Sequence, residues 1–257
     1  MSKLEDISSA VTDLTEKFPE TTKNADSVFA TIIGFFDATL TPLKMLKDII
    51  NAKYQTFKDN LSAKYNKIPA ENRKEEIDLK VIGPAVESLK FYIVDDELRD
   101  MFENLIVSSL DNRKNVFPGF VEIIRQLNSD EAKIIKRYSK DYQKSYPIID
   151  IRGKLPSNKG FINLVSNFTN CYTEVCEKPE MIPLYIDDML RLGLINIQET
   201  LFLKDENMYE NIKKNSLIAA FFEKPTYNGF PIEMKKKMFE VTNLGKRFID
   251  ACVLREK

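Results

Sequence analysis

Clusters of carboxylates are the residues in this chain best suited to chemistry. The densest are Asp95-Asp96-Glu97 and Asp187-Asp188. Two neighbouring acids can bind magnesium, or act as general acid and general base when their surroundings separate their pKa values. The first cluster, however, stands where Asp95 can cap a helix, and the second falls on the polar face of another. We therefore interpret both clusters as structural and predict neither a catalytic residue nor a metal ligand among them.

The three cysteines could bind a metal or provide a reactive thiolate. Cys171 and Cys176 form a C-x4-C pair and Cys252 is distant, so the fourth ligand of a structural zinc site is missing. Three cysteines cannot all pair, and a chain of 257 residues does not need disulfides for stability. We expect buried, inert thiols in a reducing compartment, and we predict no cofactor.

Most catalytic templates fail because their residues are absent. The chain has no histidine, which is the usual general base near neutral pH and the usual partner of a serine or cysteine nucleophile. It contains neither G-x-x-x-x-G-K-[ST] nor G-x-G-x-x-G, the loops that bind nucleotide phosphates. Asp78-Leu79-Lys80 matches the D-x-K ending of one nuclease motif, but the upstream P-D is missing. The sequence therefore predicts a protein that is not an enzyme.

Basic residues near the C-terminus are the candidate contacts to nucleic acid. The chain as a whole is almost neutral, with 38 Lys and Arg against 39 Asp and Glu, so any binding to DNA or RNA would have to be local. A second basic stripe follows residues 133–140, and the helix that would enter the groove, residues 183–192, carries two acids against Arg191. Nucleic acid is thus a weak alternative partner. The candidate contacts are Lys235, Lys236, Lys237, Lys246 and Arg247.

Helices are the elements that must position these residues. Eight glycines and eleven prolines are few for this length, and Lys, Glu, Leu and Ile are abundant, which favours helices over a many-turned β fold. The N-terminal sequence has no basic region followed by an apolar run, so it predicts no secretion signal and a cytoplasmic protein. We expect the first 26 residues to form a short or frayed helical arm.

An amphipathic stretch follows this arm and is the candidate assembly or membrane face. Its apolar residues recur three or four positions apart with one longer step, which predicts one long helix or two, with a break or kink that Pro42 causes near Leu40–Thr41. Charged residues interrupt the stretch before about 20 apolar residues accumulate, so no spanning helix is expected. Peripheral membrane contact remains an alternative to packing against protein. The face consists of Phe29, Ile33, Phe36, Leu40, Leu43, Ile50, Tyr54 and Phe57.

The remaining pattern predicts a mainly α fold with an α+β part that resembles a winged helix. Helices are expected at 85–92, from Asp95 to Leu110, and at 120–127, 130–139, 160–176, 183–192 and 244–254. Short strands are expected at 147–152, 196–203 and 237–241. We expect an N-terminal amphipathic helical region at 1–69, a central helical domain at 70–128 and a winged-helix-like C-terminal domain at 129–257.

The middle of the chain resembles the abortive-infection alpha family, a bacterial domain of unknown function. The resemblance rests on V-I-G-P-A-V-E-S-L-K-F-Y, on D-D-E-L-R-D-M-F-E-N-L-I-V-S-S-L-D, and on F-P-G-F-V-E-I-I-R-Q-L-N-S-D-E-A-K-I-I-K. The C-terminal D-M-L-R-L-G-L-I and V-T-N-L-G-K-R-F-I-D-A-C are also similar. Members often have His-Pro where this chain has Phe117-Pro118, which puts any mechanism that uses that histidine in doubt.

The resemblance implies a role in defence against phage, in which the infected cell is shut down, and it implies no catalytic residue. The residues next to the shared positions, Glu103, Asn104 and Arg125, are expected to be exposed and could form a partner surface. We expect a protein that binds a protein partner or forms a homo-oligomer. A membrane-acting effector and a DNA-binding regulator are the alternatives.

Overall fold

The computed structural model describes residues 25–44, 48–156 and 159–253. Two compact units divide the chain. The helical unit comprises residues 1–127 and 251–254, and the sheet unit comprises 128–250 and 255–257. The expected boundary between residues 69 and 70 therefore falls inside the helical unit. Most of the arm expected over the first 26 residues lies outside the described residues.

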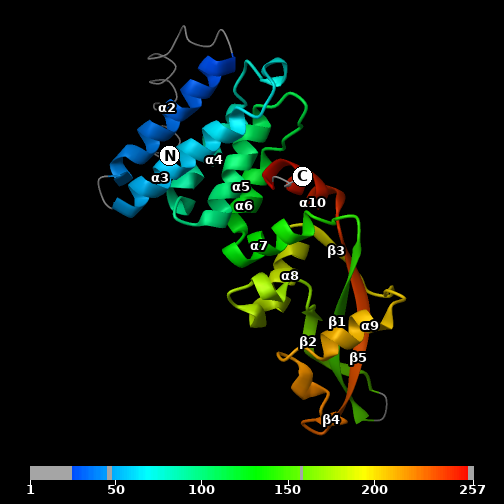
Figure 1. Ribbon diagram of the computed structural model, residues 1–257. Helices are drawn as coiled ribbons and strands as arrows, with labels where there is room; N and C mark the ends of the chain where they lie inside the picture. Colours follow the sequence, from blue (N-terminus) through cyan, green and yellow to red (C-terminus); the bar gives the residue numbers. More distant parts are fainter. Residues whose placement is uncertain (1–24, 45–47, 157–158, 254–257) are drawn as a thin grey trace. The chain divides into compact units, whose positions relative to one another are not determined.

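The helical unit contains five α-helices and the last residues of a sixth within its described part (Figure 1). Its elements are α2 (Ala25–Lys44), α3 (Asp48–Tyr65), the 3-10 turn Ala70–Asn72, α4 (Leu79–Tyr92), α5 (Asp96–Ser109) and α6 (Gly119–Gln126). Of the predicted break or kink near Leu40–Thr41, the break is wrong, because α2 continues through Lys44. Pro42 removes only one backbone donor, and it does so in the last turn, where the helix is about to end.

Caps and apolar contacts explain these helices. The side chain of Asp78 accepts the N–H of Lys80 at the start of α4, and Asp95 accepts the N–H groups of Glu97 and Leu98 at the start of α5. These bonds satisfy backbone donors that have no partner inside the helix. α5 is buried from Met101 to Ser109, because α3, α4 and α6 pack around it.

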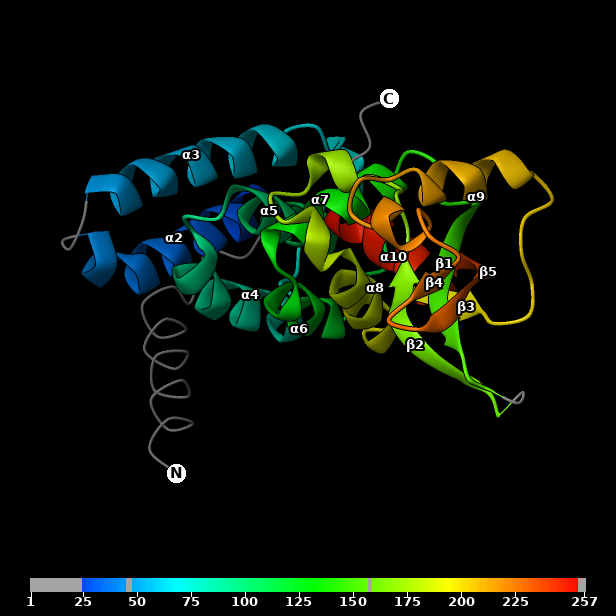
Figure 2. The same ribbon diagram turned by 90° about the horizontal axis from the view of Figure 1, so that it is seen from below.

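The sheet unit consists of a five-stranded antiparallel sheet with helices (Figure 2). The strand order is β2-β1-β5-β3, and β4 pairs with the first residues of β5. β1 and β5 pair from Ser145 opposite Glu240 to Gly153 opposite Ile232. The elements are α7 (Ser129–Tyr138), β1 (Ser145–Lys154), β2 (Phe161–Phe168), α8 (Ile182–Arg191), β3 (Ile195–Gln198), α9 (Glu206–Lys213), β4 (Thr226–Tyr227), β5 (Phe230–Val241) and α10 (Asn243–Cys252).

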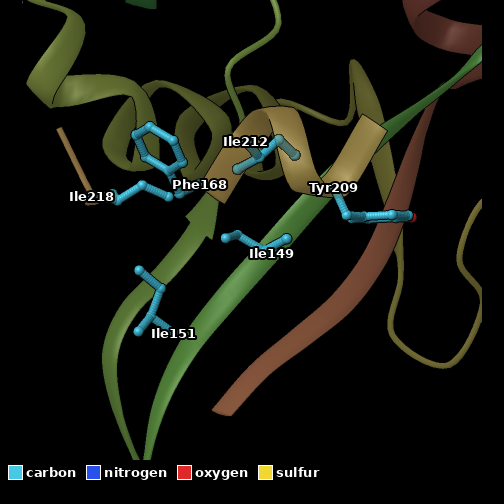
Figure 3. Packing of buried hydrophobic residues seen from close by; sticks show 6 residues of the cluster. All are labelled: Ile149, Ile151, Phe168, Tyr209, Ile212 and Ile218. Carbon is cyan, nitrogen blue, oxygen red and sulfur yellow. The ribbon is translucent and has the colours of Figure 1, made fainter. Parts of the chain in front are cut away.

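One face of the sheet packs against α9. Figure 3 shows the side chains that meet there, from β1, from the end of β2, from α9 and from the segment that follows it. All are buried, and the hydroxyl of Tyr209 donates to the carbonyl of Lys237, with a distance of 2.8 Å between the two oxygens. The cluster consists of Ile149, Ile151, Phe168, Tyr209, Ile212 and Ile218.

The predicted mainly α fold is wrong, because the structure is α+β. The helix expected at 160–176 is replaced in its first half by β2, which pairs with β1. Asn163, Ser166 and Asn167 are weak helix formers, and Asn167 has a positive φ of 55° that no helix allows. The strand expected at 237–241 is the last part of the twelve-residue β5. No helix among the described residues is long and apolar enough to cross a membrane.

Candidate interaction surface

Helix α4 has one buried face and one exposed face. The buried face consists of Val81, Ile82, Ala85, Val86, Ser88 and Leu89. Opposite them lie Leu79, Gly83, Glu87 and Phe91, spaced four residues apart, and Val94 follows in the turn after the helix. Residues at this spacing share one side of a helix. We call the exposed side, Leu79, Lys80, Gly83, Pro84, Glu87, Phe91 and Val94, the α4 face.

The α4 face exposes three large apolar side chains. Phe91 is 71% exposed, Val94 52% and Leu79 50%. Lys90 places its Nζ 4.9 Å from the centroid of the Phe91 ring. No atom lies within 4 Å of the place where a Cβ of Gly83 would stand, so that position is open to solvent. Large apolar side chains exposed on one surface are the feature that protein–protein contacts use.

The predicted assembly or membrane face lies mainly inside the helical unit. Phe36, Tyr54 and Phe57 are fully buried, and the rings of Phe36 and Phe57 meet edge to face with centroids 4.8 Å apart. Phe29 stacks on Tyr65 at 4.2 Å. Ile33 and Ile50 are half-buried. The side chains of Leu40 and Leu43 lie outside the described residues. The stripe therefore joins α2 to α3 rather than facing outward.

The predicted nucleic-acid contacts are largely occupied by acids of the same unit. Lys235 and Lys237 reach the carboxylate of Glu199, which follows β3. Lys236 points to the other side of β5, as alternation along a strand requires, and pairs with Glu206 of α9. Lys246 is half-buried and Arg247 is exposed on α10. Three of the five predicted contact residues therefore lie on one strand, β5, and each of the three is paired with a glutamate of the same unit.

Lys237 is the centre of a buried polar network that sequence reasoning assigned to the surface. Its side chain is 2% exposed, and its Nζ lies 2.7 Å from Oδ1 of Asp150 and 2.6 Å from Oδ1 of Asn167. The backbone N–H of Asn167 also donates to Asp150 at 3.0 Å. Burial by itself raises the pKa of Asp150, but the hydrogen bonds from Lys237 and Asn167 outweigh it and hold that pKa below its usual value. No signal in the sequence connects Asp150 with Lys237.

The predicted partner surface of Glu103, Asn104 and Arg125 is not formed as expected. Glu103 and Asn104 are fully buried in α5. Lys64 donates to Glu103 at 2.6 Å, and Asn104 donates to the carbonyl of Cys252 at 3.0 Å. Both therefore stabilise the helical unit from inside. Arg125 is exposed and pairs with Glu122 one turn before it.

A family model described as abortive infection alpha matches residues 50–252 of this chain. The chain belongs to the abortive infection alpha family. The match begins in α3 and ends at the last residue of α10, so it includes the α4 face, whereas residues 1–49 precede it. A comparison with curated proteins found no match.

One solved structure is similar to part of this family member. It is an uncharacterized protein from the hydrocarbon-degrading marine bacterium Alcanivorax borkumensis SK2. The two chains are 16% identical, and the alignment covers 48% of this chain and 83% of the other with a TM-score of 0.30. At this score the likeness carries no argument about fold or function.

The carboxylates and cysteines of this family member have structural partners. Asp187 accepts the side-chain amide of Asn167 at 2.6 Å, and Asp188 pairs with Arg191. Burial raises the pKa of Cys171 and raises that of Cys176 to about 11, which leaves both thiols protonated at neutral pH. Within the described ranges, no three His, Cys, Asp or Glu side chains are grouped so that they could hold a metal ion.

Proposed function

We propose that this protein acts in an abortive infection response to phage without catalysing a reaction, by binding another protein through the α4 face. The family supports the biological setting. The observation that supports the mode of action is the exposure of Phe91, at 71% the most exposed of the large apolar side chains in the described residues.

The physical reason is the free energy that such a face can contribute to binding. Single exposed apolar residues are common on monomers and need no explanation. Leu79 and Phe91 differ from scattered residues because they lie on one side of one helix, with Gly83 between them, and Val94 follows in the turn after that helix. An aromatic side chain that fills a partner's pocket at the centre of an interface often contributes about 2 kcal/mol or more, which corresponds to roughly 30-fold in affinity.

The substitution Phe91→Asp in the full-length protein tests this proposal. A carboxylate on the α4 face would be buried unpaired against the partner, so we expect bacteria that express the variant to lose protection in a phage plaque assay. Phe202→Asp is the matched control, because Phe202 is also an exposed aromatic residue, at 55%, but lies in the loop after β3. Circular dichroism should show that both variants remain folded.

The two variants give opposite expectations. The control should protect as well as the unchanged protein, and a photo-crosslinking residue at position 91, but not at position 202, should form a protein adduct of defined mass. If Phe91→Asp protects fully and position 91 forms no adduct, the α4 face is not the interface and the proposal is wrong.

A further inference from the structure

The α4 face contains a row of side chains that has the same kind of residue at both ends. Side chains four residues apart form a ridge that is inclined to the axis of a helix. On α4 this ridge consists of Leu79, Gly83, Glu87 and Phe91, with an exposed apolar side chain at each end. Because its two ends are alike, the ridge can lie antiparallel beside the same ridge of an identical helix.

An antiparallel pair of these ridges brings complementary shapes together. When a two-fold axis passes midway between Gly83 and Glu87, Phe91 lies beside the partner's Leu79, and Glu87 lies beside the partner's Gly83. Phe91 is 71% exposed and Leu79 50%, so both have apolar surface to bury. The position of a Gly83 Cβ has no atom within 4 Å, and glycine has no side chain, so a second helix can approach closely there.

The charges on the face also fit a second copy. The Glu87 side chain is 55% exposed, and the Nζ of Lys90 lies 3.7 Å from its Oε1. Lys80 is exposed, and no acid pairs with it in the described part of the chain. It precedes Gly83 by three residues, about one helical turn. A Glu87 carboxylate beside the partner's Gly83 therefore reaches the partner's Lys80, and the two-fold axis repeats this pair.

The same carboxylate disfavours other occupants of the face. Glu87 stands in the middle of the ridge, between Gly83 and Phe91. A lipid surface or a purely apolar protein would bury this charge without a second cation, which costs free energy. A second copy supplies that cation through its Lys80.

We propose that the partner of the α4 face is a second copy of this chain, and that the two α4 helices cross antiparallel about a two-fold axis between Gly83 and Glu87. This inference rests on the proposed function, since it names the partner of the same surface. A two-fold contact of this kind is complete with two copies. One helix of each copy is a small interface, so we expect a dissociation constant of about 10–100 µM.

Sedimentation velocity of the full-length protein over a series of concentrations tests this dimer. The unchanged protein should pass from monomer to dimer as its concentration rises. Phe91→Asp should weaken the dimer at least about tenfold, because it places a charge against the partner's Leu79. Phe202→Asp is again the matched control and should leave the dissociation constant unchanged. The crosslinked adduct at position 91 should have the mass of two chains.

A charge exchange tests the register of the two helices. Lys80→Glu puts two acids together at each of the two symmetry-related contacts, and Glu87→Lys puts two lysines together there. Each variant alone should therefore dimerise about fivefold or more weakly than the unchanged protein. An equimolar mixture of the two variants should recover the dimer, because every acid at these positions then faces a lysine of the other chain. Positions 80 and 87 are about 10 Å apart along one helix, so a pairing within one chain cannot explain the recovery.

The outcomes separate this dimer from the proposed function. The dimer is overturned if the unchanged protein is monomeric at about 1 mM, if its dissociation constant is the same in Phe91→Asp, or if mixing the two charge variants recovers nothing. A monomeric protein whose Phe91→Asp variant loses phage protection would reject the second copy and retain the α4 face as an interface. A dimer that behaves as expected, together with full protection by Phe91→Asp, would retain the second copy and reject the proposed function.

Discussion

Lys237 illustrates how a residue can look like a surface contact and belong to the core. It stands in a run of three lysines, yet it is enclosed by Asp150 and Asn167, and its carbonyl accepts the hydroxyl of Tyr209. Two opposite charges in a buried site stabilise a fold only when each has its partner and its hydrogen bonds. The network therefore holds β1, the end of β2 and β5 in one register.

Replacing Lys237 with Met should destabilise the sheet unit strongly at neutral pH. The variant removes one of the cations that pair with the Asp150 carboxylate, which is 3% exposed, and leaves it the Arg152 guanidinium at 3.1 Å. Losing one member of a buried pair costs up to about 3–5 kcal/mol. Lys235→Met should cost less than about 1 kcal/mol, because Lys235 pairs with the exposed Glu199. Urea denaturation at pH 7 measures both values. If both variants lose equally little free energy of unfolding, Lys237 is not essential for the stability of the sheet unit.

The same variant should show a characteristic dependence on pH. The pKa of Asp150 is lower in the folded protein than its ordinary value of 3.8, so the ionised carboxylate stabilises the fold above that value. This stabilisation is lost as the pH falls through the folded pKa. In Lys237→Met the carboxylate keeps only the support of Arg152 and of the N–H of Asn167. Lowering the pH should therefore narrow the difference in stability between the variant and the unchanged protein. If the difference in free energy of unfolding between Lys237→Met and the unchanged protein widens below pH 4, this account is wrong.

Glu131 should make stability depend on pH in the opposite direction. Burial raises its pKa to about 7, the N–H of Asn128 opposes this, and the carboxylate of Asp188 raises the pKa further. The folded protein therefore keeps a proton that the unfolded chain releases near its ordinary pKa of 4.5. Stability accordingly falls as the pH rises from about 4.5 to about 7.

The substitution Glu131→Gln isolates this effect. Glutamine can still accept the N–H of Asn128, as Glu131 does at 2.8 Å in the capping box of α7, but it carries no charge. We expect the variant to be about 1–3 kcal/mol more stable than the unchanged protein at pH 8 and similar to it at pH 5. Chemical denaturation at the two pH values measures the difference. If the stability difference between Glu131→Gln and the unchanged protein is the same at both pH values, Glu131 does not titrate between pH 5 and pH 8.

At the scale of elements, the polar side of α5 stabilises the end of α10. Asn104 donates to the carbonyl of Cys252, and the hydroxyl of Ser108 donates to the carbonyl of Ala251 at 2.8 Å. The last carbonyls of a helix have no hydrogen-bond donor within it. For these two carbonyls, side chains of α5 are the donors. A buried carbonyl that loses its donor costs free energy.

Ser108→Ala should therefore destabilise the helical unit by about 1–2 kcal/mol. Ser109 provides a matched control, since it is also buried on α5 but donates to Ile106 of its own helix at 2.7 Å. Ser109→Ala should change the free energy of unfolding by only a few tenths of a kcal/mol, because the bond of Ser109 to the Ile106 carbonyl is local to one helix and joins no second element. Similar losses for both serines would assign the effect to cavity formation instead.

The elements that could be predicted are those whose signals are local. Asp95 before α5 and Asn128 before α7 are residue types that cap the N-terminus of a helix, and in the structure both side chains accept backbone N–H groups of the first turn. β2 could not be predicted in the same way, because its residues become a strand through pairing with β1. Likewise, the partner that buries Lys237 is Asp150, which is 87 positions away. Phe91 has the sequence pattern of a core residue, because it begins the apolar run Phe91–Val94, yet it is exposed.

At the scale of the whole molecule, the described part of the chain passes between its two units twice, after Leu127 and again near the end of α10. Residues 251–253 belong to the helical unit and are buried there. The match to the abortive infection alpha family spans both units and ends at Cys252. The last residues of α10 are therefore part of the helical unit although they are far from the rest of that unit in sequence.

Truncation after Asp250 tests the importance of this second passage. The shortened chain lacks the carbonyls that Asn104 and Ser108 bind and the buried side chain of Cys252. Amides of α5 should then exchange with solvent faster, because an interior left with unpaired polar groups opens more readily. Those at the centre of β1 and β5 should keep their protection, since their pairing from Tyr146 to Gly153 loses no partner. Hydrogen–deuterium exchange resolves the two sets in one experiment, and a uniform loss across both would show that the units unfold as one.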